Sequence, residues 1–222
     1  MLTDTAANDF NQAIDIYLDS FQANERQTID EVKNRIQRNI YMMIVMKNKE
    51  AVIGFSLIHP FKNQKFGLLD YLAVKKEYRN RKIGSLLFTY SYNELMRIYP
   101  EIKFMVIEVD DPEYSDSDEK ISRVNRIKFY EKLGARIIHK FKYNMPPMIS
   151  EAKPSNMRLM VYGNHGNTRL ESHRLKEILI SLYKQNYNRG EDDSYLLEML
   201  SSLNVKTFTL GNYNSINLSR EE

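Results

Sequence analysis

Apolar residues recur along this chain with two different periods, and the two periods predict an alternation of helices and strands. Helical spacing over residues 10–21 predicts a first helix, and Thr28 is placed to cap a second one that runs to about residue 36. Two apolar runs at residues 41–46 and 51–59 flank a polar turn and predict a β-hairpin. We therefore expect two short helices followed by paired strands.

The middle of the chain continues as strands that alternate with helices. Pro100 ends a long amphipathic pattern, and Gly134 follows a second one in the position of a helix C-cap. The expected elements are strands at residues 66–74, 103–109, 135–143 and 157–162, and helices at residues 83–98 and 122–133. This order favours a mixed α/β fold.

The last sixty or so residues carry a different pattern. Residues 163–168 resemble a linker, and leucine-rich sets over 175–182 and 196–203 recur at i, i+3, i+4 and i+7. These sets predict two amphipathic helices. We expect a main domain at residues 1–162 and a helical C-terminal extension at residues 163–222, which packs on the core or on a dimer partner.

Composition excludes several classes of protein and site. The chain has no cysteine, so disulfides, thiolate metal sites and cysteine nucleophiles are impossible. Its four histidines show no metal-binding spacing, and we predict no metal. No apolar run reaches the length of a membrane span, and the net charge of +3 is too weak to indicate nucleic acid, so we expect a cytoplasmic protein with neither partner.

The junction between the strand at 66–74 and the helix at 83–98 carries the most informative chemistry. It holds a compact basic run and Gly84 at the start of the helix. The first N–H groups of a helix lack internal partners, the helix dipole adds positive charge, and glycine lets an anion approach the backbone. This turn therefore suits a diphosphate, although strand-to-helix turns with solvated basic residues are also common.

The segment resembles the R/Q-x-x-G-x-G/A motif of the GNAT superfamily of acyl-CoA-dependent N-acyltransferases. Arg79, Gly84 and the strand Leu72-Ala73-Val74 match it, whereas Lys82 stands where the family usually has its first glycine. The resemblance implies acetyl-CoA or another acyl-CoA as co-substrate. It places the cofactor on the strand and turn residues Leu72, Ala73, Val74, Arg79, Asn80, Arg81, Lys82, Ile83, Gly84 and Ser85.

A second stretch, RVNRIKFYEKLGARII, resembles the other characteristic GNAT pattern, N-x-x-x-F/L-Y-x-x-x-G-F/A. Asn125, Phe129, Tyr130, Gly134 and Ala135 fill it, and the resemblance makes Asn125 and Phe129 cofactor contacts. Two motifs in the right order are far more specific than one. The resemblance covers residues 8–162 and implies a splayed, mostly antiparallel central sheet of six to seven strands flanked by helices.

Acyl transfer to an amine needs a proton donor for the leaving thiolate and a proton acceptor for the amine. Tyr130 is the predicted acid, since a phenol stays protonated at neutral pH. Glu108 is the predicted base, acting directly or through water, and Asp70 is its rival. Either carboxylate could instead be a solvated strand residue, and Tyr130 a core tyrosine.

Recognition of the acceptor is assigned with less support from the sequence. Glu25 and Arg26 lie between the first two helices, where the superfamily shapes its acceptor pocket, although an ordinary surface pair explains them better. Asp70, and Asp110 at the start of an acidic loop, are further candidates for contact with a cationic substrate. The expected reaction moves an acetyl or related acyl group to a primary amine of a small molecule, peptide or protein.

Two alternatives remain open at this stage. Lys82 is compatible with a non-catalytic module that binds acyl-CoA without turnover. A longer acyl donor is compatible with the Met-rich and aromatic C-terminal segment, if its helices line a tunnel. The oligomeric state is either monomer or homodimer.

Overall fold

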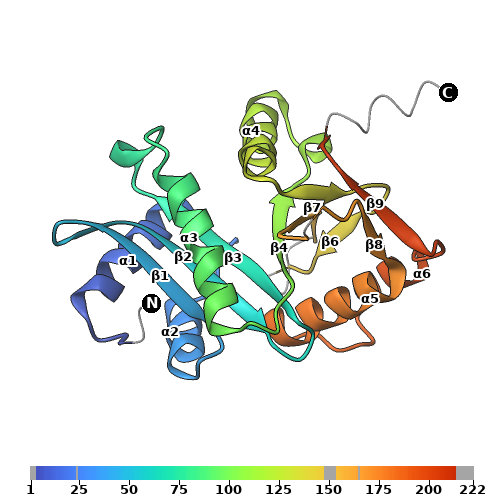
Figure 1. The fold of residues 1–222 in the computed structure, drawn as a ribbon, viewed down its shortest axis with the longest axis horizontal. Coiled ribbons are helices and arrows are strands. Elements are labelled where there is room, and N and C mark those ends of the chain that lie inside the picture. The colour runs from blue at the N-terminus through green and yellow to red at the C-terminus, as the bar shows by residue number, and fades with distance from the viewer. Residues whose placement is uncertain (1–3, 24, 148–153, 165, 214–222) are drawn as a thin grey trace. The chain divides into compact units, whose positions relative to one another are not determined.

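The structure of this chain is a computed structural model that describes residues 4–23, 25–147, 154–164 and 166–213. The chain divides into two compact units, Met1–Lys103 and Phe104–Glu222. Within each unit the strands pair antiparallel, and helices flank them (Figure 1). The predicted mixed α/β class with a mostly antiparallel sheet is confirmed. The different division expected from the sequence, at residues 162 and 163, stays a prediction.

Three strands form the sheet of the N-terminal unit. They are β1 (Met42–Asn48), β2 (Ala51–Phe61) and β3 (Phe66–Val74). A tight turn joins β1 to β2, and Lys49 in this turn adopts a positive φ of 53°. The predicted hairpin and the third strand are therefore confirmed, and β3 has the predicted bounds.

Helices cover both faces of this sheet (Figure 1). On one face, α1 (Asn8–Ser20) and α2 (Ile29–Gln37) form a buried cluster with residues of β2 such as Phe55. On the other face lies α3 (Ile83–Ile98), whose buried Ser91 hydroxyl shares a 2.6 Å hydrogen bond with the hydroxyl of Ser56 in β2. Because successive strand residues point to opposite faces, both helix layers are needed to bury β2 from Val52 to Phe61.

Local sequence explains where these helices begin and how closely they pack. The Thr28 hydroxyl accepts a hydrogen bond from the Glu31 N–H at 3.2 Å, and the Glu31 carboxylate accepts one from the Thr28 N–H at 3.1 Å. This capping box starts α2 at the predicted residue. A Cβ atom at Gly67 would lie 2.5 Å from Leu95 of α3, so glycine permits the close contact between α3 and β3.

Strand β7 lies at the centre of the C-terminal unit. It pairs with β4 along one edge and with β5 and β6 along the other, while β9 joins β5 to β8. The strands of this unit are β4 (Phe104–Asp110), β5 (Arg136–Ile138), β6 (Tyr143–Met145), β7 (Ser155–Tyr162), β8 (Arg169–Glu171) and β9 (Thr207–Gly211).

The helices of this unit include the two predicted in the C-terminal segment. They are α4 (Ser117–Leu133), α5 (Ser172–Ser181), the π-helical turn η3 (Leu182–Asn186) and α6 (Ser194–Ser201). Gly134 has a φ of 107° and donates its N–H to Glu131 O, which confirms it as the end of α4. In the described residues no helix is long and apolar enough to span a bilayer.

The strands of this unit also differ from expectation in two places. The single strand expected at residues 135–143 is two short strands, because Lys140 between them adopts a positive φ of 56°. The C-terminal extension contains strands β8 and β9 besides its helices. The described residues therefore hold more strands than the six to seven predicted.

Candidate active site

The start of α3 offers three backbone amides within the basic turn. The first hydrogen bond of the helix runs from the Leu86 N–H to Lys82 O at 3.0 Å, so the N–H groups of Ile83, Gly84 and Ser85 precede it. The described structure shows no side chain that caps this helix start. These groups are the orphan donors of a helix N-terminus, and they carry its positive dipole end.

Lys82 adopts the backbone conformation that glycine adopts most easily. It is the N-cap of α3, with φ 61° and ψ 7°, and Asn80 two residues earlier has the same φ of 61°. A left-handed conformation costs a residue with a Cβ atom about 1–2 kcal/mol. The lysine that replaces the usual glycine of the motif is thus strained, and its side chain is exposed.

Arg79 ties the turn to the end of β3. Its Nε donates a hydrogen bond to Val74 O at 2.9 Å. The Lys75 N–H donates to Ile53 O of β2 at 2.9 Å, and main-chain groups alternate between the two edges of an antiparallel strand. The main-chain groups of Leu72 and Val74 therefore face the edge of β3 away from β2, whereas those of Ala73 face β2.

The side chains around this turn carry both signs of charge. A cavity of about 430 Å³ lies between α1 and the turn, and its lining includes both acidic and basic side chains. The Arg81 guanidinium lies outside this lining, 5.7 Å from the centre of the Tyr78 ring. The lining of the cavity consists of Asp15, Ile16, Asp19, Ser20, Lys75, Lys76, Glu77 and Arg79.

Tyr130 lies on α4 and is 8% exposed. Burial disfavours the phenolate and raises the pKa of Tyr130 to about 12, while the nearby charge of Arg126 opposes the shift. The Phe129 ring packs edge-on at 5.0 Å. Asn125, one turn earlier, is exposed. The tyrosine therefore keeps its proton over the whole physiological pH range.

Glu108 of β4 is held by two tyrosines from distant segments. The Tyr143 hydroxyl donates to Oε1 of Glu108, and the Tyr187 hydroxyl donates to Oε2 at 2.6 Å. Tyr143 is buried on β6, and burial together with the negative charge of Glu108 raises its pKa well above the usual value. The Tyr143 phenol therefore stays protonated and acts as a donor to the carboxylate.

Asp70 of β3 has a comparable arrangement in the N-terminal unit. Its Oδ2 accepts hydrogen bonds from the Tyr41 hydroxyl and from Gln27 Nε2, the latter at 3.1 Å. Arg35 donates to the same tyrosine oxygen at 3.2 Å. Burial and the charge of Asp70 raise the pKa of Tyr41 well above its usual value. Gln27 and Tyr41 are both almost fully buried, so they fix the orientation of the carboxylate.

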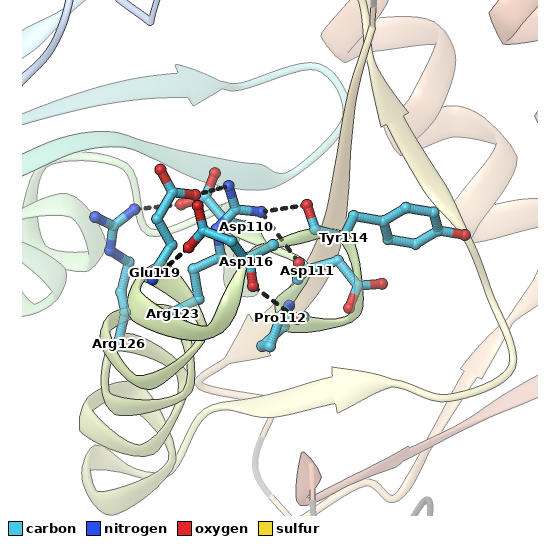
Figure 2. A network of polar contacts seen from close by, with 9 residues as sticks. Asp110, Asp111, Pro112, Tyr114, Asp116, Glu119, Arg123 and Arg126 are labelled. Carbon is cyan, nitrogen blue, oxygen red and sulfur yellow. Dashed lines mark hydrogen bonds and ion pairs between the residues drawn. The ribbon is translucent and has the colours of Figure 1, made fainter.

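The acidic loop after β4 is neutralised by arginines (Figure 2). Asp110 pairs with Arg126 at 2.6 Å, and Glu119 pairs with Arg123 at 2.7 Å. Asp116 accepts a hydrogen bond from the Glu119 N–H at 3.0 Å and so helps to start α4. The loop acts as a cap and ion-pair network, and the proposed substrate contact of Asp110 stays a prediction.

The two residues expected near the acceptor make local contacts. Arg26 donates to Leu18 O near the end of α1 at 3.1 Å. The main-chain oxygen of Glu25 accepts a hydrogen bond from the Tyr71 hydroxyl at 3.4 Å. Arg26 therefore stabilises the connection between α1 and α2, and a role of either side chain in binding substrate stays a prediction.

Four residues that hold the candidate carboxylates were not predicted from the sequence. Gln27, Tyr41, Tyr143 and Tyr187 lie outside both motifs, and no local pattern distinguishes them from structural residues. A partly buried carboxylate on a strand needs hydrogen-bond donors. Tyrosines elsewhere in the chain could therefore have been considered as its partners. Across the described part of the chain, no group of three or more acidic or histidine side chains could hold a metal ion.

Comparisons with known proteins relate this fold to acetyltransferases. Residues 39–134 match the family model of the acetyltransferase (GNAT) domain. A protein of the GNAT family from Bacteroides thetaiotaomicron superposes with a TM-score of 0.63 at 21% identity, over 82% of this chain and 93% of its own. No curated protein sequence matches the chain.

A ribosomal-protein-alanine N-acetyltransferase from Brucella melitensis has a TM-score of 0.50 at 14% identity, over 70% of this chain and 95% of its own. Likeness at such identity supports the shared fold. The family-model match begins three residues before β1 and ends at Gly134, so it includes the first motif and all of the second except Ala135. Residues 39–134 therefore match the GNAT acetyltransferase domain, and the fold is similar to that of a GNAT-family structure.

Proposed function

We propose that this chain transfers an acetyl group from acetyl-CoA to a primary amine of a small molecule, peptide or protein by direct attack in a ternary complex. The family match supports acyl-CoA-dependent N-acetyl transfer in general. The observation that carries the proposal for this chain is the start of α3, where three amides without a capping side chain emerge from a basic turn.

The turn supplies what a diphosphate requires. The N–H groups of Ile83, Gly84 and Ser85 donate to its oxygens, and the helix dipole favours its charge. The exposed side chains of Arg81 and Lys82 add positive charge. In this arrangement Arg79 shapes the turn through Val74 O rather than serving mainly as a phosphate ligand.

The side chains that take part in the acetyl transfer lie on β4 and α4. As the amine nitrogen bonds to the acyl carbon, Glu108 accepts the proton that the nitrogen loses, directly or through water. The bond from the acyl carbon to sulfur breaks, and the sulfur leaves with the electron pair. Tyr130 donates a hydrogen bond to this sulfur as its negative charge grows.

The raised pKa of Tyr130 decides how far its proton moves. A reference thiol has a pKa near 8.5, so complete transfer from a phenol with a pKa of about 12 is uphill by roughly 4–5 kcal/mol. Hydrogen-bond donation costs no such energy. We therefore assign Tyr130 the role of a fixed donor that stabilises the thiolate, which takes its proton from solvent after it leaves.

Calorimetry and turnover together test this function. We expect acetyl-CoA to bind and acetyl-pantetheine, which lacks the diphosphate, to bind at least about 100-fold more weakly, since several charge-assisted hydrogen bonds are lost. A panel of primary amines should then release CoA. Absence of any binding of acetyl-CoA would refute the proposal, and binding without turnover on any amine would favour the non-catalytic module.

A further inference from the structure

The C-terminal segment reaches the candidate base, although it lies outside the residues that match the family model. Tyr187 follows the π-helical turn η3 and donates its hydroxyl to Oε2 of Glu108 at 2.6 Å. The segment thus contacts the side chain proposed to accept the proton, at a separation of 79 positions in the chain.

Several contacts fix the position of Tyr187. Its N–H donates to Leu182 O at 3.1 Å, the i→i+5 bond of the π-helical turn. The buried Tyr183 in the same turn donates its hydroxyl to Asn144 O of β6. Arg189 donates to Pro147 O at 2.8 Å. The widened turn is therefore anchored on both sides of Tyr187, and such turns occur frequently at functional sites.

Two phenol donors change what Glu108 can do. Hydrogen bonds to an ionised carboxylate stabilise its charged form, and a donor on each oxygen prevents rotation of the group. A carboxylate accepts up to about four hydrogen bonds, so two tyrosines do not exhaust its capacity. The two tyrosines hold the Glu108 carboxylate in one orientation. They leave it able to accept a proton from the amine or from a water.

We propose that Tyr187 is a positioning residue for acetyl transfer, which holds the Glu108 carboxylate in one orientation and makes the C-terminal segment part of the active site. This inference rests on the proposed function, with Glu108 as the proton acceptor. Tyr187 acts through Glu108 and need not touch the substrate.

Kinetics of Tyr187→Phe test the inference, with Tyr195→Phe as the matched control from the same segment. Tyr187→Phe should lower kcat about 10- to 100-fold, the effect of removing one hydrogen bond to a charged group, with the KM for acetyl-CoA changed less than about twofold. Tyr195→Phe should leave both constants within about twofold. Thermal unfolding of each variant shows that the comparison is between folded proteins.

A double-mutant cycle separates positioning from a purely structural role. In the Glu108→Gln background, Tyr187→Phe should cause no further loss of kcat, because its action passes through the carboxylate. Equal loss in both backgrounds, or loss equal to that of Tyr195→Phe, would overturn the inference and leave the proposed function intact. If the unsubstituted protein bound acetyl-CoA but acetylated no amine, the proposed function would fail and this inference with it.

Discussion

Arg158 of β7 forms an ion pair with Asp111, with 2.7 Å between Nε and Oδ2 and side chains only 9% and 4% exposed. The same guanidinium lies 3.5 Å from Glu113. Asp111 begins the acidic loop, and its N–H donates to Asn156 O at 3.2 Å. The loop that follows Glu108 is therefore attached to the central strand of its unit by both main chain and side chain.

Removing one partner of this buried pair should be costly. Arg158→Met leaves the Asp111 carboxylate buried without its cation, and we expect the free energy of unfolding to fall by about 3–5 kcal/mol. Arg97→Met is the control, since Arg97 is 68% exposed and its solvent-screened pair with Glu94 should contribute little to stability. Urea denaturation measures both values. Similar losses in the two variants would contradict the assignment.

The strain at Lys82 makes a prediction about stability. Lys82→Gly should be more stable than Lys82→Ala by about 1 kcal/mol, because glycine adopts the φ of 61° without a steric penalty. Both variants lose the same charge, so the difference reports the backbone alone. Thermal unfolding in the absence of ligand measures it, and an alanine variant as stable as the glycine variant would show that the left-handed conformation is wrong.

The hydroxyl of Tyr130 should matter for rate and little for binding. We expect Tyr130→Phe to lower kcat about 10- to 100-fold and to leave the Kd for acetyl-CoA within about threefold. In addition, kcat should not decline through Tyr130 below pH 10, since its pKa is about 12. An unchanged kcat in the phenylalanine variant would return Tyr130 to the role of a core residue.

The same pKa predicts how stability depends on alkaline pH. The unfolded chain loses the Tyr130 proton near pH 10 and the folded chain near pH 12, so stability from this group is complete below pH 10 and lost as the pH rises to 12. Between pH 9 and pH 11 the unsubstituted protein should lose roughly 1 kcal/mol more than Tyr130→Phe does. Urea midpoints at the two pH values measure this difference.

Two conservative variants distinguish the rival bases. Glu108→Gln should lower kcat by about 100-fold or more if it accepts the proton, whereas Asp70→Asn should then act mainly on the KM of the amine. Both substitutions preserve size and remove charge. The reverse pattern would make Asp70 the base, and a moderate loss of kcat in both would indicate that water takes the proton.

The parts of the fold that could be predicted have strong local signals. Thr28 and Glu31 form a capping box that the sequence displays directly, and β3 is a long apolar run between turns. Strands β8 and β9 could not be predicted, because strands of three and five residues are too short to show a clear period. Arg169 pairs with Thr209, although α5 and α6 lie between these two residues in the sequence. Only the folded chain brings them together.

The candidate site likewise contains some residues that the sequence predicts and others that it does not. Asp70 and Glu108 could be recognised as carboxylates within apolar strands, and the turn at Gly84 by its charge and its motif. The tyrosines that hold Glu108 come from β6 and from the residue after η3, so their contacts arise from tertiary structure alone. The catalytic roles of Tyr130 and Glu108 stay predictions until the variants are measured.

The paired hydroxyls of Ser56 and Ser91 have a consequence for the ligand. They form a buried polar contact between β2 and α3, and sliding the helix by one turn would leave both hydroxyls buried without this partner, at about 1–3 kcal/mol each. The hydrogen bond between the two serines thus favours a single position of α3 against β2. In the proposed function the first turn of α3 binds the diphosphate, and this constraint would set the position of that turn before any ligand arrives.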